Sequence, residues 1–142
     1  MLLILTNNTM KNLWSRVFHF VVQYRFAKSL LHLGLQPHDV CAMIGFNSPE
    51  YYFSLQGTWM AGCVTAGIYT TNSPDACQYV LEHSEAHVCV CQSGKSAMKI
   101  ASICENLPKL KAIVVYWPDG DLPVLGEKCV GFNIQRMIEL EN

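Results

Sequence analysis

One stretch decides the fold: VCAMIGFNSPE, from Val40 to Glu50. Its first part, Val40–Phe46, is a continuous apolar run, as expected for a strand that is buried on both faces of a parallel sheet. The stretch then places Ser48 before Pro49 and Glu50, which suits an N-cap, a first helical position and an acid at the positive end of a helix. It therefore predicts a strand that leads directly into a helix.

The same pattern returns 25 residues later in the chain. Val64–Tyr69 is again apolar, and Ser73 again precedes a proline and an acid, Pro74 and Asp75. This repeated pairing of a strand with a helix start predicts an internal βα repeat.

Two further apolar runs follow at nearly the same spacing, His87–Cys91 and Ala112–Tyr116. The segments between the runs, Asp75–Ser84 and Lys95–Asn106, carry apolar residues at helical intervals. Strands that alternate with helices in this way form parallel sheets with right-handed crossovers. We therefore predict an α/β fold with a partial doubly wound, mostly parallel sheet.

The two ends of the chain extend this pattern. Before the first strand, Gly34 is predicted to be the C-cap of a helix, with Pro37 just beyond it. Apolar residues at intervals of three and four define one stripe of that helix: Leu13, Val17, Phe20, Tyr24, Ala27 and Leu31. After the last strand, Trp117–Gly131 is predicted to be a loop, and Ile134–Leu140 a short amphipathic helix.

Composition bounds the function as well as the fold. The 142 residues suit a single domain, and the contents of 51% hydrophobic and 15% charged residues exclude intrinsic disorder. The net charge of −1 leaves no basic footprint, so no nucleic acid is expected as a partner. With so few charges, either the surface is unusually apolar or part of it lies against something outside this chain.

No transmembrane segment is expected. The start of the chain lacks the basic region and the long apolar run of a signal peptide. Arg16, Arg25 and Lys28 interrupt the longest apolar span, Leu13–Leu35. The seven cysteines form no CxxC pair and predict reduced thiols in a cytoplasmic protein. Peripheral association with membranes stays open.

Two motifs near the third strand invite a chemical role. Ser93–Ser96 (SGKS) lies where a phosphate-binding loop would lie, but Cys89 stands where that loop needs its first glycine. A polar loop between strand and helix is the better interpretation. Cys89 and Cys91 share one face of the predicted strand, where buried thiols act as small hydrophobic groups.

His83 and His87 flank Glu85 in the sequence HSEAH. A zinc-protease helix needs glutamate directly after the first histidine and both imidazoles on one helix. Capping or surface roles are therefore favoured over metal binding. The sequence assigns no catalytic residue and no metal ligand.

Ligands of open α/β sheets bind beyond the carboxyl ends of the strands. The most polar of these positions are Thr70, Thr71 and Asn72, which are the candidate cofactor-binding residues. Threonine and asparagine are also common in turns, so a purely structural role in this turn is the favoured alternative.

Beyond these patterns, the chain resembles a known family. Five segments carry the similarity: Ala27–Leu35, Gly45–Glu50 (GFNSPE), Trp59–Gly62 (WMAG), Gly67–Pro74 (GIYTTNSP) and Leu107–Val114. They resemble the N-terminal region of fatty-acid–CoA ligases, and more narrowly of bubblegum-type long-chain acyl-CoA synthetases. The similarity runs from about Tyr24 to Pro123.

The resemblance implies a reaction in two steps. ATP first joins a fatty acid to AMP with loss of pyrophosphate, and the thiol of CoA then displaces AMP. ATP, Mg2+ and CoA are thus implied for the full-length family. That family's phosphate loop, its Tyr-Gly-x-Thr-Glu motif, its ribose-binding aspartate and the lysine of its C-terminal domain have no match in this chain. No cofactor is therefore expected to bind this chain productively.

We expect three regions: an atypical segment 1–23, an incomplete N-terminal α/β part of a synthetase domain at 24–123, and a loop with a short helix at the truncated end, 124–142.

The expected function is that of an inactive fragment of a long-chain fatty-acid–CoA ligase. Its expected partners are the remainder of the synthetase or the full-length enzyme and, by family, a fatty acid. Two alternatives stay open: a regulatory fragment that pairs with the full-length enzyme, and a small nucleotide-binding module that uses Ser93–Ser96.

Overall fold

A five-stranded parallel sheet forms the centre of the molecule, with strand order β2-β1-β3-β4-β5. The computed structural model describes residues 7–117 and 130–133, and the side chains of residues 16–117. The strands are β1 (Val40–Ile44), β2 (Val64–Ile68), β3 (Ala86–Ser93), β4 (Ala112–Trp117) and β5 (Val130–Asn133). The first four strands confirm the predicted apolar runs.

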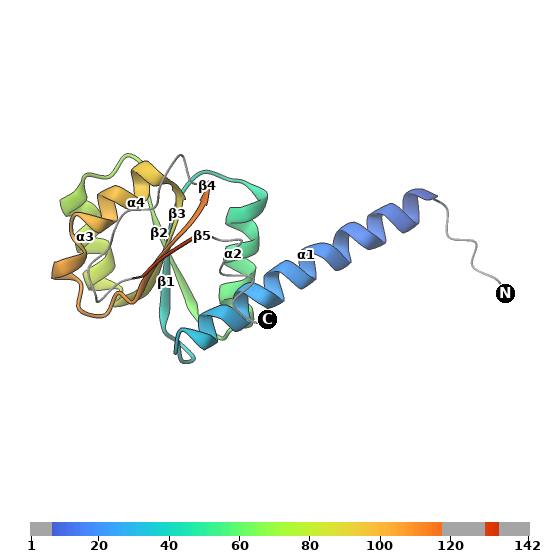
Figure 1. Ribbon diagram of the computed structural model, residues 1–142, viewed down its shortest axis with the longest axis horizontal. Helices are drawn as coiled ribbons and strands as arrows, with labels where there is room; N and C mark the ends of the chain where they lie inside the picture. Colours follow the sequence, from blue (N-terminus) through green and yellow to red (C-terminus); the bar gives the residue numbers. More distant parts are fainter. Residues whose placement is uncertain (1–6, 118–129, 134–142) are drawn as a thin grey trace.

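Helices cover both faces of this sheet (Figure 1). On one face lie α1 (Asn7–His32) and α2 (Pro49–Met60), and on the other α3 (Pro74–His83) and α4 (Gly94–Ala101). A 3₁₀ turn, η1 (Cys104–Asn106), follows α4. The three layers confirm the predicted doubly wound α/β fold.

The core is divided in two by the sheet. Successive residues of a strand point to opposite faces, so Cys89 and Cys91 pack against α3 and α4, while Val88 and Val90 pack against α1 and α2. All four side chains are fully buried or nearly so. Burial on both faces explains why β3 is a continuous apolar run rather than an alternating one.

Serine residues begin the helices at the carboxyl ends of the strands. Ser48 Oγ accepts a hydrogen bond of 3.1 Å from the Tyr51 amide, and Ser73 Oγ one of 3.3 Å from the Ala76 amide. Both predicted N-caps are confirmed, with proline at the start of each helix. Ser93 caps α4 in the same way, which the sequence pattern did not indicate.

Several boundaries differ from the prediction. The helix predicted to reach Asn106 ends at Ala101, where the Ser102 hydroxyl donates to the Lys99 carbonyl at 2.8 Å and competes with the helical backbone. Of the loop predicted at Trp117–Gly131, Trp117 lies in β4 and residues 130 and 131 lie in β5, while residues 118–129 lie outside the described residues. The short helix predicted at Ile134–Leu140 lies outside the described residues.

The long helix α1 is confirmed, and Gly34 ends it with a φ of +78°. Among its described side chains, the buried hydrophobic ones are Phe26, Ala27 and Leu30. They meet α2 at Gly57, where a Cβ atom would lie 2.7 Å from the Gln23 carbonyl oxygen. Of the members of the predicted stripe whose side chains are described, only Ala27 is buried, whereas the others face solvent: Val17, Phe20, Tyr24 and Leu31.

Candidate functional site

The carboxyl ends of β1 to β4 meet at one edge of the sheet. The direction of winding reverses between β1 and β3, because β2 lies on one side of β1 and β3 on the other. Open α/β sheets bind their ligands outside such a reversal. The loop after β1, residues 45–48, and the end of β3 therefore form the candidate site.

Two side chains from distant strands shape this site. Gln92, near the end of β3, accepts a hydrogen bond of 2.8 Å from the Phe46 amide through its Oε1 atom. Tyr116 of β4 lies across Gly45, so a Cβ atom at Gly45 would collide with the tyrosine hydroxyl. The loop after β1 is thus held in place by β3 and β4.

The site also contains two buried oxygen atoms that lack a hydrogen-bond partner among the described residues, Tyr116 Oη and Glu50 Oε2. Burial raises the pKa of Tyr116, and the neighbouring Ser48 hydroxyl opposes that shift. Tyr116 therefore stays a neutral phenol that can donate or accept one more hydrogen bond. The sequence pattern indicated Glu50 only as the acid at the start of a helix and gave Tyr116 no role at a site, because the proximity of the two residues arises only from the strand order.

The candidate residues Thr70, Thr71 and Asn72 follow β2 at the same edge. Lys99 of α4 reaches this turn, and its Nζ atom donates to the carbonyl oxygens of Thr70 at 3.0 Å and Asn72 at 2.6 Å. The backbone of the turn is therefore fixed by a lysine that sequence reasoning did not select. Within the described residues, the three side chains make no hydrogen bond of their own.

The segment Ser93–Ser96 is the junction of β3 and α4. Ser93 Oγ accepts a hydrogen bond of 3.4 Å from the Ser96 amide, and the helix begins at Gly94. The segment therefore runs from strand into helix without the wide glycine loop that wraps its amides around a phosphate. Lys95 is exposed.

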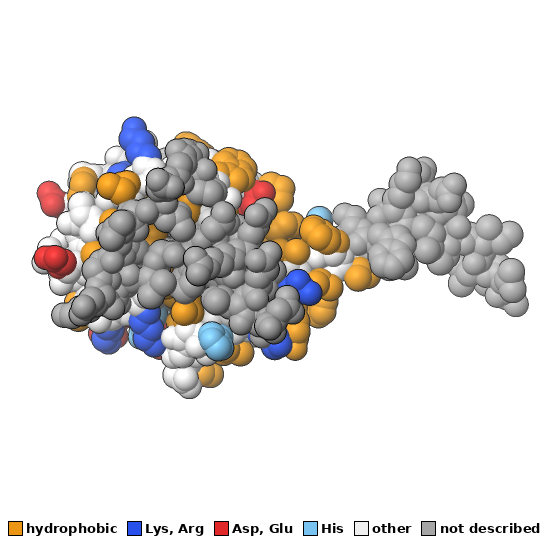
Figure 2. All heavy atoms as spheres, viewed as in Figure 1, with side chains coloured by type: hydrophobic (Ala, Val, Ile, Leu, Met, Phe, Trp, Pro, Cys, Tyr) orange, Lys and Arg blue, Asp and Glu red, His pale blue; other side chains and the backbone are white. Residues whose placement is uncertain are grey.

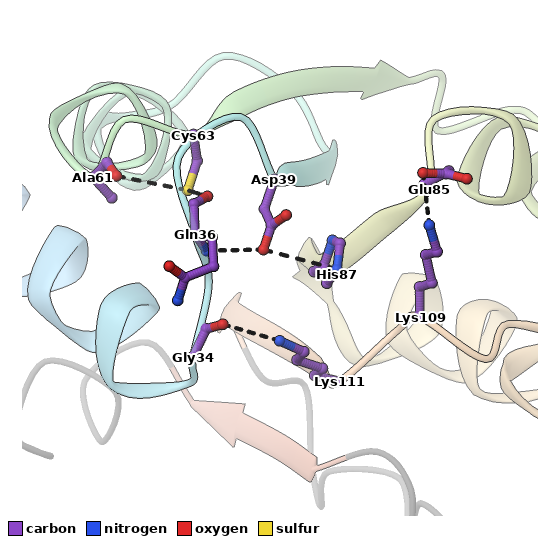
Figure 3. A network of polar contacts seen from close by, with 9 residues as sticks. All are labelled: Gly34, Gln36, Asp39, Ala61, Cys63, Glu85, His87, Lys109 and Lys111. Carbon is purple, nitrogen blue, oxygen red and sulfur yellow. Dashed lines mark hydrogen bonds and ion pairs between the residues drawn. The ribbon is translucent and has the colours of Figure 1, made fainter.

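A second polar group lies at the opposite, amino-terminal edge of the sheet (Figure 3). Asp39 accepts from the Gln36 amide at 2.9 Å, and its other neighbour is His87, at 3.8 Å from Oδ2 to Nε2. Lys109 pairs with Glu85 at 2.7 Å and holds the pKa of that carboxyl below its usual range. These contacts tie loops together.

The two histidines and the glutamate of the HSEAH motif therefore lie in three different structural elements. His83 stacks on Tyr79 at the end of α3, Glu85 occupies a turn with a φ of +54°, and His87 lies in β3. Among the described residues, no three His, Cys, Asp or Glu side chains are grouped as metal ligands.

Five of the described cysteines are buried: Cys41, Cys63, Cys77, Cys89 and Cys91. Cys89 and Cys91 lie on one face of β3, as predicted, with their sulfur atoms 3.9 Å apart in the core. Burial raises the pKa of Cys41 to about 12, and the pKa of Cys89 is raised by its contact with Cys91 and by burial. These thiols stay protonated at neutral pH and are poor nucleophiles.

The carboxyl edge of the sheet carries three serine-capped helix starts and one turn that is fixed by Lys99. Within the described part of the chain, no helix is both long enough and apolar enough to cross a membrane.

Fold and site together define a class: a doubly wound α/β unit with strand order 2-1-3-4-5 and a polar carboxyl edge. Comparison with known proteins gives the family. The sequence pattern of the family described as "AMP-binding enzyme" matches residues 23–129. The chain belongs to this AMP-binding enzyme family.

Curated relatives are long-chain-fatty-acid–CoA ligases. The chain is 43% identical to ACSBG1 of Rattus norvegicus over 109 residues, which cover 75% of this chain and 15% of the relative. It is 45% identical to ACSBG1 of Homo sapiens over 98 residues, which cover 69% of this chain and 14% of that relative. The resemblance to the N-terminal part of bubblegum-type ligases is confirmed, and the chain spans about 15% of the relatives it matches.

Solved structures confirm the fold. The anthranilate CoA ligase AuaEII, solved with anthranoyl-AMP, superposes with a TM-score of 0.69 at 24% identity, over 84% of this chain and 20% of its own. The A domain of the carboxylic acid reductase from Segniliparus rugosus gives a TM-score of 0.74 at 13% identity. The match covers 85% of this chain and 22% of the reductase chain. The α/β unit therefore has the fold of the N-terminal subdomain of adenylate-forming enzymes.

Proposed function

We propose that residues 24–123 supply the N-terminal α/β part of a long-chain fatty-acid–CoA ligase, which converts ATP, a fatty acid and CoA to acyl-CoA, AMP and diphosphate. The observation that carries this proposal is the 43% identity to ACSBG1 over 109 residues. The matching topology of the sheet supports it. The substrate class, ATP, Mg2+ and CoA come from the family and belong to this proposal.

In this proposal the chain does not activate fatty acids by itself. Adenylation needs groups that neutralise the phosphates while the carboxylate attacks, and each such group typically contributes a factor of about 100–1000 in rate. The proposal is supported by the segment Ser93–Ser96, which runs directly from β3 into α4, and by the described residues, in which no three His, Cys, Asp or Glu side chains are grouped as metal ligands. The partner that would complete the site is the remainder of the synthetase or a full-length enzyme.

The test is ATP–pyrophosphate exchange with palmitate and Mg2+, using purified chain and, as a positive control, a full-length ligase of the same family. We expect exchange at the level of a heat-treated sample. Exchange clearly above that level would overturn the proposal of inactivity and leave the family assignment intact.

Thr70, Thr71 and Asn72 are the residues that we propose to face a cofactor in the complete enzyme. Their support is their place at the carboxyl edge and the Lys99 contacts that fix the turn. Titration of the isolated chain with radiolabelled ATP is expected to show no saturable binding. Saturable binding that is lost in Lys95→Ala would favour the small nucleotide-binding module instead.

A regulatory fragment that pairs with the full-length enzyme is the second candidate. The observation in its favour is the exposed apolar surface, which includes Trp59 and Met60 at the end of α2 and Val64 of the edge strand β2. Co-purification with a tagged full-length ligase tests this candidate.

We further propose a cytoplasmic location for the chain.

A further inference from the structure

Charge is distributed very unevenly between α1 and the rest of the chain. Asn7–His32 contains four Lys or Arg residues and no Asp or Glu. The rest of the chain contains six Lys or Arg residues and all eleven Asp and Glu residues. The helix is therefore a cationic element attached to an acidic body.

The exposed side of α1 is apolar. An α-helix turns by about 100° per residue, which places five exposed side chains on one stripe about 100° wide. The stripe consists of Val17, Phe20, Val21, Tyr24 and Leu31, each exposed by 39% or more. The rings of Phe20 and Tyr24 stack along it, with their centroids 6.3 Å apart.

The two arginines of the described helix flank this stripe. Helical geometry places Arg16 on one side of it and Arg25 on the other. Lys28 lies within the stripe, with its ammonium group 5.6 Å from the centre of the Tyr24 ring. The buried residues Phe26 and Leu30 point the opposite way, into the core.

The position of the helix makes this stripe accessible. In Figure 1, α1 packs on the body through its C-terminal part and projects away from it at its N-terminal part. Figure 2 shows hydrophobic side chains gathered where α1 leaves the body, with basic side chains beside them. The positive charge and the apolar, aromatic stripe are two features that α1 shares with helices that lie in a membrane interface.

We propose that α1 binds the chain to the surface of an anionic lipid bilayer. The stripe enters the boundary between headgroups and acyl chains, and Arg16 and Arg25 contact lipid phosphates on either side. The helix lies in the plane of the membrane and does not cross it. The inference is independent of the proposed enzymatic function.

Charge selects the bilayer over a second copy of the chain. If two α1 helices paired along the stripe, the cations of both would be brought together, and neither helix carries an acid to pair with them. An anionic surface supplies the opposite charge. The apolar stripe is needed in both arrangements, so the arginines discriminate between them.

The experiment is co-sedimentation of the full chain with vesicles of phosphatidylcholine, with and without phosphatidylserine. A sample without vesicles corrects for aggregation. We expect binding to the anionic vesicles, little binding to the neutral ones, and strong weakening between about 0.1 M and about 1 M salt. The fold of each variant is checked by its thermal unfolding.

Two variants test the two features of the helix. Arg16→Gln with Arg25→Gln is expected to lower partitioning about fivefold per arginine, and Phe20→Ser with Tyr24→Ser about tenfold per residue. Tyr79→Ser, which removes an exposed aromatic side chain from α3, and Lys95→Gln, which removes an exposed charge from α4, are the matched controls and should bind normally.

Three results would overturn the proposal. The first is equal binding to neutral and anionic vesicles, and the second is binding that the α1 variants leave unchanged. The third is self-association, measured by light scattering, that the Phe20 and Tyr24 variant abolishes while vesicle binding is absent. This last result would assign the stripe to a second copy of the chain.

Discussion

Tyr116 shows how one side chain shapes the candidate site. Its ring lies over Gly45, and its hydroxyl occupies the space that any larger residue there would need. The tyrosine is 5% exposed, and its hydroxyl has no partner among the described residues. The glycine is therefore required by a contact between the loop after β1 and β4, and its φ is not in the left-handed region.

We expect Gly45→Ala to destabilise the chain by about 1–3 kcal/mol, as overpacking of a filled space does. Tyr116→Phe removes the atom in closest conflict, so the double variant should recover part of this loss. The free energies of unfolding of both single variants and the double variant form a cycle. Additive effects would contradict the proposed contact.

We expect Ser48→Ala to lower the free energy of unfolding by about 1 kcal/mol, because the Tyr51 amide loses its side-chain acceptor. Ser48→Asp keeps an acceptor at the same position and should restore most of the stability. Chemical denaturation of the three proteins measures the difference. A loss as large in Ser48→Asp as in Ser48→Ala would show that the cap is not the cause.

At the scale of elements, Lys99 links two helices on one face of the sheet. It extends from α4 to the turn that leads into α3, where it binds the carbonyls of Thr70 and Asn72. Hydrogen bonds from a charged donor contribute more than neutral ones. The turn that holds the candidate cofactor-facing residues is therefore positioned by a different βα unit.

Replacing this lysine should loosen the turn. We expect Lys99→Met to lower the free energy of unfolding by about 1–3 kcal/mol and to speed hydrogen exchange in residues 69–76. Lys95→Met, at an exposed position one turn earlier on the same helix, is the control and should change neither. Equal effects of the two variants would indicate a general role of helix charge.

At the scale of the whole molecule, the sheet has an open edge. β2 is an outer strand, and Val64 at its start is 47% exposed. Unpaired edge strands with apolar side chains favour association with other chains. The exposed stripe of α1 adds to this apolar surface, so the isolated chain is expected to associate and to bind a hydrophobic dye.

Val64→Lys places a charge on the open edge and should lower the mean molecular mass measured by light scattering at a fixed concentration. Tyr79→Lys makes the same change of charge at an exposed position of α3, outside the strand itself, and serves as the control. A similar decrease in both variants would assign the effect to net charge. A monodisperse wild-type monomer would contradict the expectation itself.

Local patterns determined much of this protein. Apolar runs gave β1 to β4, and serine-proline pairs gave the starts of α2 and α3. These features depend on residues that are neighbours in the chain, so the sequence alone is sufficient to predict them. The resemblance to fatty-acid–CoA ligases rests on the same segments, and the comparisons confirmed it.

Tertiary structure alone decided the rest. It placed Gln92 and Tyr116 against the loop after β1, and it brought Lys99 to the turn after β2. It also selected the buried side of α1, because Phe26 packs closely on Gly57 of α2 and the longer apolar stripe stays in solvent. Contacts between segments far apart in the chain depend on strand order and helix packing, which no local pattern specifies.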